Sequence, residues 1–333
     1  MSPATRNHWL SSGWGYRPNG QDALLRAITR IGSLQAGRRY VWRGVADATW
    51  RVQSSLWRHL DKHAPGDAPY SEQLARAAER DALRRAREWG LGLHGATHLP
   101  DLQLLASLQH HSLPTRLLDV TANPYTALWF ACASDLGRDN VAGALLAFDV
   151  TDLPVQRTIP LLPAEVMTWA ALESTPSSNL LAALEASTDS RRPFLVEPTV
   201  RDDRMAAQEG LFLASAFIPD TDPDTGLDGL ELTHEAAPGH DRLGKLFAPT
   251  ERGRGAPHQL PFCALVIKPR TKKAVRGHLA GTYARDLKRL FPDIGGLAQD
   301  FGQDPGVVTI PATETAPSDE TKATPRPPVD DPS

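Results

Sequence analysis

The sequence predicts an α+β protein, with a mixed or antiparallel central sheet covered by flanking helices in one domain. Several segments have the composition and apolar spacing of helices, and several short apolar runs bounded by turn residues have the length of buried strands. These strands are scattered among the helices and do not alternate strictly with them, which favours an α+β arrangement over a doubly wound parallel sheet. A hydrophobic fraction of 41% is sufficient for a sizeable core.

Helices are predicted where apolar residues recur with helical spacing or where helix-forming residues dominate. Residues 20–31 carry apolar side chains on one helical face, and Gly32 follows them as a stop signal. Residues 71–89 are rich in Ala, Leu, Arg and Glu, and Ser71 is suited to cap their first turn. The arginines of this segment alternate with acids, which favours a solvated, salt-bridged face over a nucleic-acid contact. Three further predicted helices cover residues 101–111, 122–134 and 275–290.

Strands are predicted where β-prone or continuously apolar runs end at turn residues. Residues 39–44 are β-prone and end at Gly44. Three later runs have the length of a strand and are bounded by turn residues. Their continuous apolar composition indicates that these strands are buried. They cover residues 142–150, 211–218 and 260–268.

The chain divides into three parts by composition and charge. Residues 1–34 are predicted to form an N-terminal helical extension and residues 35–310 the domain, in which residues 219–258 form a long connection. Residues 311–333 are rich in Pro, Thr and acids and have little to bury, which predicts a disordered tail. This tail holds five acids and two bases, so its charge of −3 equals that of the whole chain. The body is therefore neutral, and nucleic acid is not an expected partner.

Several classes of protein and site are excluded by what the sequence lacks. No run of about 18 apolar residues occurs, so no membrane span or membrane partner is expected, and the N-terminus has no secretory-signal pattern. Cys132 and Cys263 both lie in apolar runs, which predicts buried, reduced thiols in a cytoplasmic protein. Neither a phosphate-binding loop nor a dinucleotide-binding glycine fingerprint is present. His94 and His98 are four residues apart but lie in a Gly-rich loop, so no metal site is predicted.

Polar residues are concentrated in residues 109–131, directly before and within an apolar helix. Burying such groups without partners costs about 1–3 kcal/mol each, so they must pair with one another or face a ligand. If they pair with one another, Asp119 would contact Arg43 or Arg116, and Thr121 would cap the following helix. If they face a ligand, the cluster is a binding site. Its polar members are Gln109, His110, His111, Thr115, Arg116, Asp119, Thr121 and Asn123.

The sequence resembles the FRG domain family, which is named after a Phe-Arg-Gly signature. Trp-Arg-Gly at residues 42–44 resembles that signature with one aromatic residue in place of another. The family's long central motif has a Leu-Gln-His, a Pro-Thr-Arg-Leu-Leu-Asp and an Ala-Leu-x-Phe-Ala helix in that order. The resemblance implies a single FRG-type domain and a bacterial setting in defence or toxin–antitoxin systems. Four blocks carry it, at residues 39–58, 108–131, 204–212 and 283–298.

The order of the motifs also resembles, more weakly, that of ADP-ribosyltransferases. In those enzymes an Arg or His on an early strand is followed by a second strand and a helix, and later by a Glu or Gln. Here Arg43 ends the early strand, Asp119 and Thr121 precede the Ala–Phe helix, and Gln208 and Glu209 come later. This resemblance implies an ADP-ribosyltransferase-like fold with NAD as a substrate, and it indicates no other cofactor.

Under this interpretation the residue types suit cleavage of the nicotinamide–ribose bond. A carboxylate would stabilise the oxocarbenium-like centre, an arginine would clamp the pyrophosphate, and Tyr125 or Phe212 would stack on the nicotinamide. The predicted catalytic residues are Asp119, Glu209 and His110. The predicted ligand-binding residues are Arg43, Gly44, Gln109, Arg116, Thr121 and Gln208.

A non-catalytic ligand-binding or sensing module is the alternative. Arg43, Arg116 and Asp119 would then form a buried ion network, in which removal of one partner costs about 3–5 kcal/mol. The sequence leaves open whether the protein is an enzyme. A small-molecule dinucleotide or a protein target is the expected partner.

Overall fold

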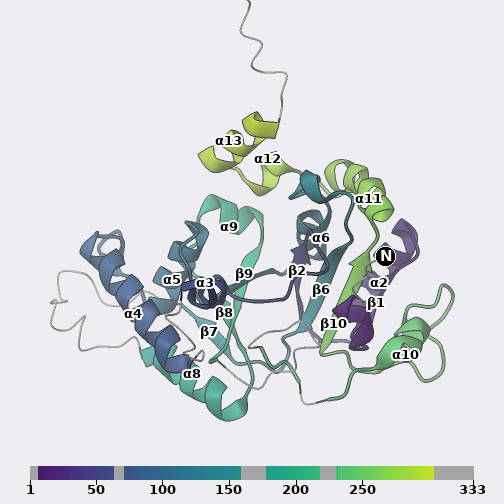
Figure 1. The fold of residues 1–333 in the computed structure, drawn as a ribbon, viewed down its shortest axis with the longest axis horizontal. Coiled ribbons are helices and arrows are strands. Elements are labelled where there is room, and N and C mark those ends of the chain that lie inside the picture. The colour runs from purple at the N-terminus through teal and green to yellow at the C-terminus, as the bar shows by residue number, and fades with distance from the viewer. Residues whose placement is uncertain (1–6, 64–70, 159–177, 218–229, 234, 304–333) are drawn as a thin grey trace, which may run out of the picture.

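The computed structural model describes residues 7–63, 71–158, 178–217, 230–233 and 235–303 (Figure 1). Eight strands form the main sheet: β1 (Gly15–Tyr16), β2 (Tyr40–Val45), β5 (Leu118–Thr121), β6 (Gly143–Asp149), β7 (Val155–Arg157), β8 (Phe194–Glu197), β9 (Gly210–Ala214) and β10 (Phe262–Ile267). Their order is β1-β10-β6-β2-β5-β9-β8-β7. The pairs β1–β10 and β7–β8 are parallel and the other neighbouring pairs are antiparallel. The predicted α+β class with a mixed central sheet is confirmed.

Helices cover this sheet, and a separate two-stranded hairpin consists of β3 (Leu93–His94) and β4 (Thr97–His98). The helices of the described residues are α1 (His8–Ser11), α2 (Gln21–Gly32), α3 (Ser55–His63), α4 (Glu72–Glu88), α5 (Asp101–His110), α6 (Pro124–Cys132), α8 (Ser178–Ser190), α9 (Asp203–Ala207), α10 (Gly239–Leu246), α11 (Pro269–Gly281), α12 (Leu287–Leu290) and α13 (Ile294–Gln303), with a 3₁₀ turn η1 (Leu136–Arg138). In Figure 1, α4, α5 and α8 lie towards one end of the sheet and α2, α10 and α11 towards the other.

The core is divided between the two faces of the sheet. Successive side chains of a strand point to opposite faces, and β2 follows this rule. Trp42 packs with α2, α6 and α11, whereas Val41 packs in a second cluster on the opposite face. A third cluster lies under α4, α5 and α8. Strand β2 is thus buried on both sides, and this packing fixes the position of Arg43, the polar residue that follows Trp42.

The N-terminal segment takes part in this architecture. Strand β1 extends the sheet by parallel pairing with β10. Trp9 is fully buried against Phe262 of β10, with ring centroids 5.6 Å apart. Residues 7–16, which fall in the predicted extension, therefore pack on the same sheet as the rest of the chain.

Strand β1 lies in the predicted helical extension and the β3–β4 hairpin in the predicted Gly-rich loop. Two longer predicted segments also have a different structure. The predicted helix over residues 275–290 is two helices, because α11 ends at Gly281 and α12 begins at Leu287; Ala284, between them, has a positive φ of 52°. Helix α10 lies within residues 219–258, which were predicted to be a loop. Parts of that segment and the whole predicted tail lie outside the described residues.

Candidate functional site

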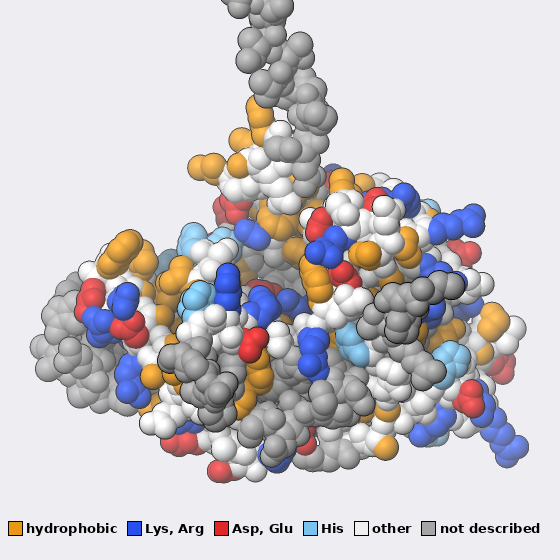
Figure 2. Space-filling view, in the orientation of Figure 1, with side chains coloured by type: hydrophobic (Ala, Val, Ile, Leu, Met, Phe, Trp, Pro, Cys, Tyr) orange, Lys and Arg blue, Asp and Glu red, His pale blue; other side chains and the backbone are white. Residues whose placement is uncertain are grey.

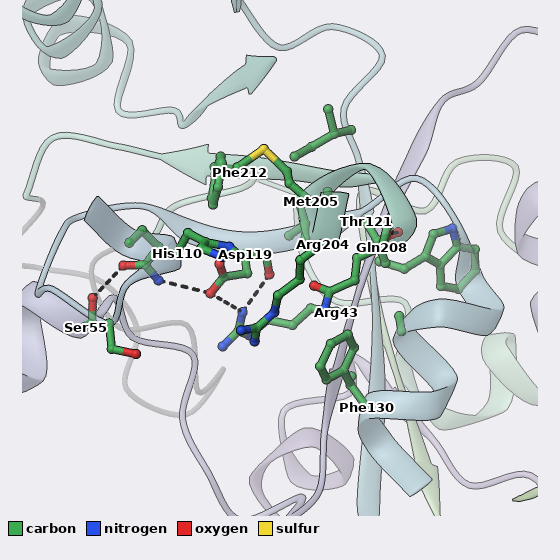
Figure 3. A pocket seen from close by; sticks show the side chains of 18 of the residues that line it. Arg43, Ser55, His110, Asp119, Thr121, Phe130, Arg204, Met205, Gln208 and Phe212 are labelled. Carbon is green, nitrogen blue, oxygen red and sulfur yellow. Dashed lines mark hydrogen bonds and ion pairs between the residues drawn. The ribbon is translucent and has the colours of Figure 1, made fainter. Parts of the chain in front are cut away.

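A pocket opens where strands β2 and β5 diverge (Figure 3). The two strands pair at one position, Trp42 with Thr121. The cavity beside this point has a volume of about 460 Å³, within the range of about 300–1,000 Å³ that is usual for small-molecule sites. Its walls come from β2, β5 and β9 and from helices α3, α5, α6 and α9.

Helix α6 forms one wall because it packs directly on β2. Asn123 caps this helix by accepting hydrogen bonds from two backbone N–H groups of the first turn, where Pro124 needs no such partner. The helix approaches Gly44 so closely that a Cβ atom there would lie 1.8 Å from the carbonyl oxygen of Ala127. Gly44 therefore lines the pocket by allowing the helix to approach the strand.

Three arginines face the pocket against one carboxylate. Arg43 comes from β2, Arg58 from α3 and Arg204 from α9, and Asp119 is the only carboxylate among the described lining residues. Lys and Arg side chains gather around the hollow near the centre of this face, where Figure 1 places α3 and α9 (Figure 2). The guanidinium group of Arg204 lies over the ring of Phe291 at 4.2 Å, which orients its plane. The net positive charge of these groups attracts an anion.

Arg43 bridges the two diverging strands. Its Nη1 donates a hydrogen bond to the backbone carbonyl of Asp119 at 2.6 Å and lies 3.6 Å from Oδ2 of the same residue. Burial lowers the pKa of Arg43 below its usual value, Asp119 acts in the opposite direction, and Arg58 adds to the lowering. An arginine nevertheless stays protonated in proteins, so the guanidinium group remains a cation between the strands.

Asp119 has one oxygen held by the protein and one that is open. Oδ2 accepts a hydrogen bond from Nε2 of Gln109 at 3.1 Å and faces Arg43. Among the described residues none donates to Oδ1, and the side chain is 59% exposed. The carboxylate is therefore fixed in position and still accessible to a ligand.

His110 lines the pocket with a ring that is neutral at pH 7. Burial lowers the pKa of His110 below its ordinary value of 6.5, and Arg204 and His111 add to this effect. Asp202, whose Oδ2 lies 3.4 Å from Nδ1, acts in the opposite direction without reversing the shift. A neutral imidazole can accept a proton, as a general base must.

We expect the stability of the fold to decrease as the pH falls below about 6.5. Burial lowers the pKa of both His110 and His8, so the unfolded chain binds protons more readily than the folded chain. Their contribution is fully present above the unfolded pKa of about 6.5 and is lost as the pH falls. Urea denaturation should give a lower midpoint at about pH 5.5 than at about pH 7, and a smaller difference in His110→Gln. A variant with the same pH dependence as the wild type would contradict this account of His110.

Gln208 and Thr121 connect the pocket to neighbouring backbone. The hydroxyl group of Thr121 donates to the carbonyl oxygen of Gln208 at 2.7 Å, and Nε2 of Gln208 donates to the carbonyl oxygen of Leu290 at 3.0 Å. In the alternative in which the polar residues pair with one another, Thr121 was expected to cap the next helix, but Asn123 has that role. Seven predicted site residues line the pocket: Arg43, Gly44, Gln109, His110, Asp119, Thr121 and Gln208.

The structure places Arg116 outside this pocket. Its Nε donates to Oε2 of Glu79 at 2.7 Å, and its Nη1 donates to Oε1 of Glu72 at 3.1 Å. Arg116 is 7% exposed and Glu79 is 2% exposed. Burial would lower the pKa of Arg116, but the two carboxylates outweigh it and the pKa is raised. Arg116 therefore pairs with helix α4, and of the two arginines considered as partners of Asp119, Arg43 is the one that faces it.

Glu209 also lies outside the pocket lining. Its Oε1 accepts hydrogen bonds from Nδ2 of Asn123 at 2.8 Å and from Nη2 of Arg285 at 2.7 Å. Its φ of 51° lies in the left-handed region, where the chain turns from α9 into β9. Both donors bind Oε1 of Glu209, and these contacts hold the start of α6 to the segment that precedes α12.

Arg58, Arg204 and Phe130 line the pocket but are absent from the predicted set. Each lies inside one of the blocks that carry the family resemblance, so the cationic and aromatic residues of those blocks were the signal that could have identified them. Of the two aromatic residues expected to stack on a ligand, Phe212 lines the pocket. Tyr125 instead stacks on a second tyrosine, with ring centroids 4.0 Å apart.

Metal and thiol chemistry find no support in the described part of the chain. There, no group of three or more His, Cys, Asp or Glu side chains is arranged to hold a metal ion, and His94 and His98 lie on the β3–β4 hairpin. Cys132 and Cys263 are free and buried, as predicted. Burial raises the pKa of Cys132 to about 12 and raises that of Cys263 as well, so neither thiol is a reactive nucleophile.

Comparison with known proteins identifies one domain. Residues 38–140 match the family model of the FRG domain. The matched segment contains β2, β5 and the helices between them, and therefore most of the pocket wall. No curated protein and no solved structure matches the chain. An FRG domain is thus present, and the comparisons lend no support to the resemblance to ADP-ribosyltransferases. Among the described residues, we find no helix with the length and hydropathy that a membrane crossing requires.

Proposed function

We propose that the pocket of this FRG domain-containing protein binds a phosphate-bearing nucleotide, and that NAD is its substrate. The observation that carries the proposal is the charge of the pocket, because three arginines line a cavity of about 460 Å³. Guanidinium groups suit phosphate because their planar forks donate two hydrogen bonds at once. The same reasoning makes a neutral or cationic ligand a poor match for this site.

The remaining walls suit the other parts of a nucleotide. Oδ1 of Asp119 is open to accept a hydrogen bond from a ribose hydroxyl group. Phe130 and Phe212 supply apolar surface on which a base or a nicotinamide ring can pack. These groups lie around one cavity together with the arginines, so a single ligand can reach all of them (Figure 3).

A catalytic role would centre on Asp119 and His110. When the bond between the ribose C1′ and the nicotinamide nitrogen breaks, its electron pair leaves with the nicotinamide and positive charge develops on the ribose. The carboxylate of Asp119 would stabilise that charge. The neutral ring of His110 would accept the proton of the attacking hydroxyl group or water. The reaction is then NAD cleavage or ADP-ribosyl transfer.

Binding without turnover is the second candidate function, and the position of Glu209 favours it. Glu209 is held by Asn123 and Arg285 outside the pocket lining. Asp119 is then the only carboxylate among the described lining residues, and it also faces Arg43. A sensing module would need the arginines and Asp119 to recognise the ligand but would release no product. A role in bacterial defence or toxin–antitoxin systems is part of the proposal through the family resemblance.

Substitution of Asp119 by Asn separates these functions. The variant keeps the shape of the side chain, and because Asp119 is 59% exposed we expect a melting temperature close to that of the wild type. If the protein is an enzyme, nicotinamide release from NAD should fall by at least about 100-fold, the order of effect expected when a charge that stabilises the transition state is removed. If the wild type binds NAD but releases no nicotinamide, the sensing function stands. A variant with full nicotinamide release would remove Asp119 from the mechanism.

A further inference from the structure

Gln109 lies between Asp119 and two hydroxyl groups from different segments of the chain. Its Oε1 accepts hydrogen bonds from Oγ of Ser55 at 3.0 Å and from Oγ1 of Thr115 at 2.8 Å. Its Nε2 donates to Oδ2 of Asp119 at 3.1 Å. The dashed lines of Figure 3 follow this series from Ser55 to Asp119 and on to Arg43.

The two hydroxyl groups determine which end of the amide faces Asp119. Oγ1 of Thr115 accepts a hydrogen bond from the backbone N–H of Leu117 at 3.2 Å, and Oγ of Ser55 accepts one from the backbone N–H of Thr115 at 3.0 Å. The hydroxyl group of Thr115 therefore has its proton left to donate to Oε1 of Gln109. The proton of Ser55 has two acceptors within reach, Oε1 of Gln109 and the backbone carbonyl oxygen of Thr115 at 3.1 Å. The carbonyl end of the Gln109 amide accepts from both, whereas its NH₂ end could accept from neither.

A rotation of the amide by 180° would make both sides of Gln109 unfavourable. The NH₂ group would then face the hydroxyl group of Thr115, which would lose the acceptor of its proton, and Thr115 is 1% exposed. The amide oxygen would face the carboxylate of Asp119, with no proton between them. A buried polar group left without a partner costs about 1–3 kcal/mol, so one orientation of the amide is strongly preferred.

We propose that Gln109 is a positioning residue that holds Oδ2 of Asp119 and leaves Oδ1 for the ligand, and that Ser55 and Thr115 set its orientation. Gln109 then acts through Asp119 and need not touch the ligand itself. Ser55 gains a role in the pocket although it lies on α3, far from Asp119 in the sequence. This inference rests on the proposed function for its consequence, but the geometry that it describes is independent of any ligand.

The first test observes the amide group of Gln109 directly, without a ligand. In NMR spectra of protein labelled with ¹⁵N in glutamine side chains, the Gln109 NH₂ signal should shift when Asp119 is replaced by Asn, which removes the charge of the acceptor. Ser55→Ala and Thr115→Val should each shift or broaden the same signal by releasing Oε1. Asp202→Asn is the matched control, because Asp202 lies 3.4 Å from His110 and no hydrogen bond or ion pair among the described residues joins it to Gln109; it should leave the signal in place. If the Gln109 NH₂ signal has the same chemical shift in Asp119→Asn as in the wild type, the proposal is overturned.

The second test separates positioning from simple structural support. Gln109→Glu keeps the acceptors for the two hydroxyl groups but replaces the donor that faces Asp119 by a second carboxylate. We expect the dissociation constant for NAD to rise by at least about tenfold, the size expected when a hydrogen bond to a charged group is lost. Because the added charge would by itself weaken the binding of an anion, Gln109→Met is measured beside it; this variant is neutral, lacks the donor to Asp119 and should also weaken NAD binding. Wild-type affinity in Gln109→Met would overturn the positioning role. If the wild type itself does not bind NAD, the proposed function fails, and the NMR comparison still decides the role of Gln109.

Discussion

Gly44→Ala is expected to destabilise the fold by at least about 3 kcal/mol. The added Cβ would lie 1.8 Å from the carbonyl oxygen of Ala127 and 2.6 Å from the backbone nitrogen of Ala131. Both contacts are with backbone atoms of α6, so no side chain can rotate to relieve them, and the helix must move away from β2. Overpacking of a core usually costs about 1–3 kcal/mol, and a clash with helix backbone belongs at the upper end or above. Urea denaturation measures the loss.

Gly277→Ala is the control for this substitution. Gly277 lies inside α11, and a Cβ there would meet nothing within 4 Å. Alanine in a helix interior is favoured over glycine by about 0.5–1 kcal/mol, so this variant should be slightly more stable than the wild type. If Gly44→Ala were as stable as the wild type, the close approach of α6 to β2, and with it the wall of the pocket, would be wrong.

Arg116→Met is expected to cost about 3–5 kcal/mol of stability. The substitution removes the cation that pairs with Glu79, which is 2% exposed, and leaves that carboxylate buried without its charge partner. The aliphatic part of the side chain is largely retained by Met, so the loss reports the charge and not the volume. Replacing Glu79 by Leu in the same chain removes the stranded charge and should recover part of the stability.

Arg84→Met supplies the comparison, because Arg84 lies on α4, the helix that carries Glu79. Arg84 pairs with Asp81 and Glu88, but its side chain is 50% exposed. Surface ion pairs are worth about 0–1 kcal/mol, so this variant should unfold close to the wild type. Equal losses for Arg116→Met and Arg84→Met would mean that the Arg116 cluster is not buried as described.

The sequence predicts the elements that depend on local pattern more accurately than the contacts between them. The helix over 71–89 was recognisable because Ser71 and a run of helix-forming residues act within a few residues of each other; Ser71 does cap α4 by accepting from the backbone N–H of Leu74. The break between α11 and α12 was missed, because it depends on a left-handed residue, Ala284, that has no glycine or asparagine signature. Helix α10 was missed for a different reason, because the Gly and Pro residues around it indicate a loop.

In the candidate site, too, contacts within one motif were predictable, whereas contacts between segments far apart in the sequence were not. The central motif places Gln109, His110 and Asp119 together because they lie on one helix end and the strand that follows it. The partner of Arg116 was not predictable, because Glu79 lies 37 residues earlier and only the packing of α4 brings it near. Arg204 reaches the pocket through the long-range pairing of β9 with β5. Periodicity in the sequence carries no information about such pairings.

The most direct test of the central claim, a phosphate-binding pocket at the junction of β2 and β5, is a calorimetric titration of the full chain with NAD. The comparison is between the wild type, Arg58→Met and Arg157→Met; Arg58 lines the pocket, whereas Arg157 is 72% exposed and pairs with Glu197 on the β7–β8 edge. We predict saturable binding to the wild type, an affinity reduced by at least about tenfold in Arg58→Met, and no change in Arg157→Met. Absence of binding to the wild type, or equal affinities for all three proteins, would contradict the account.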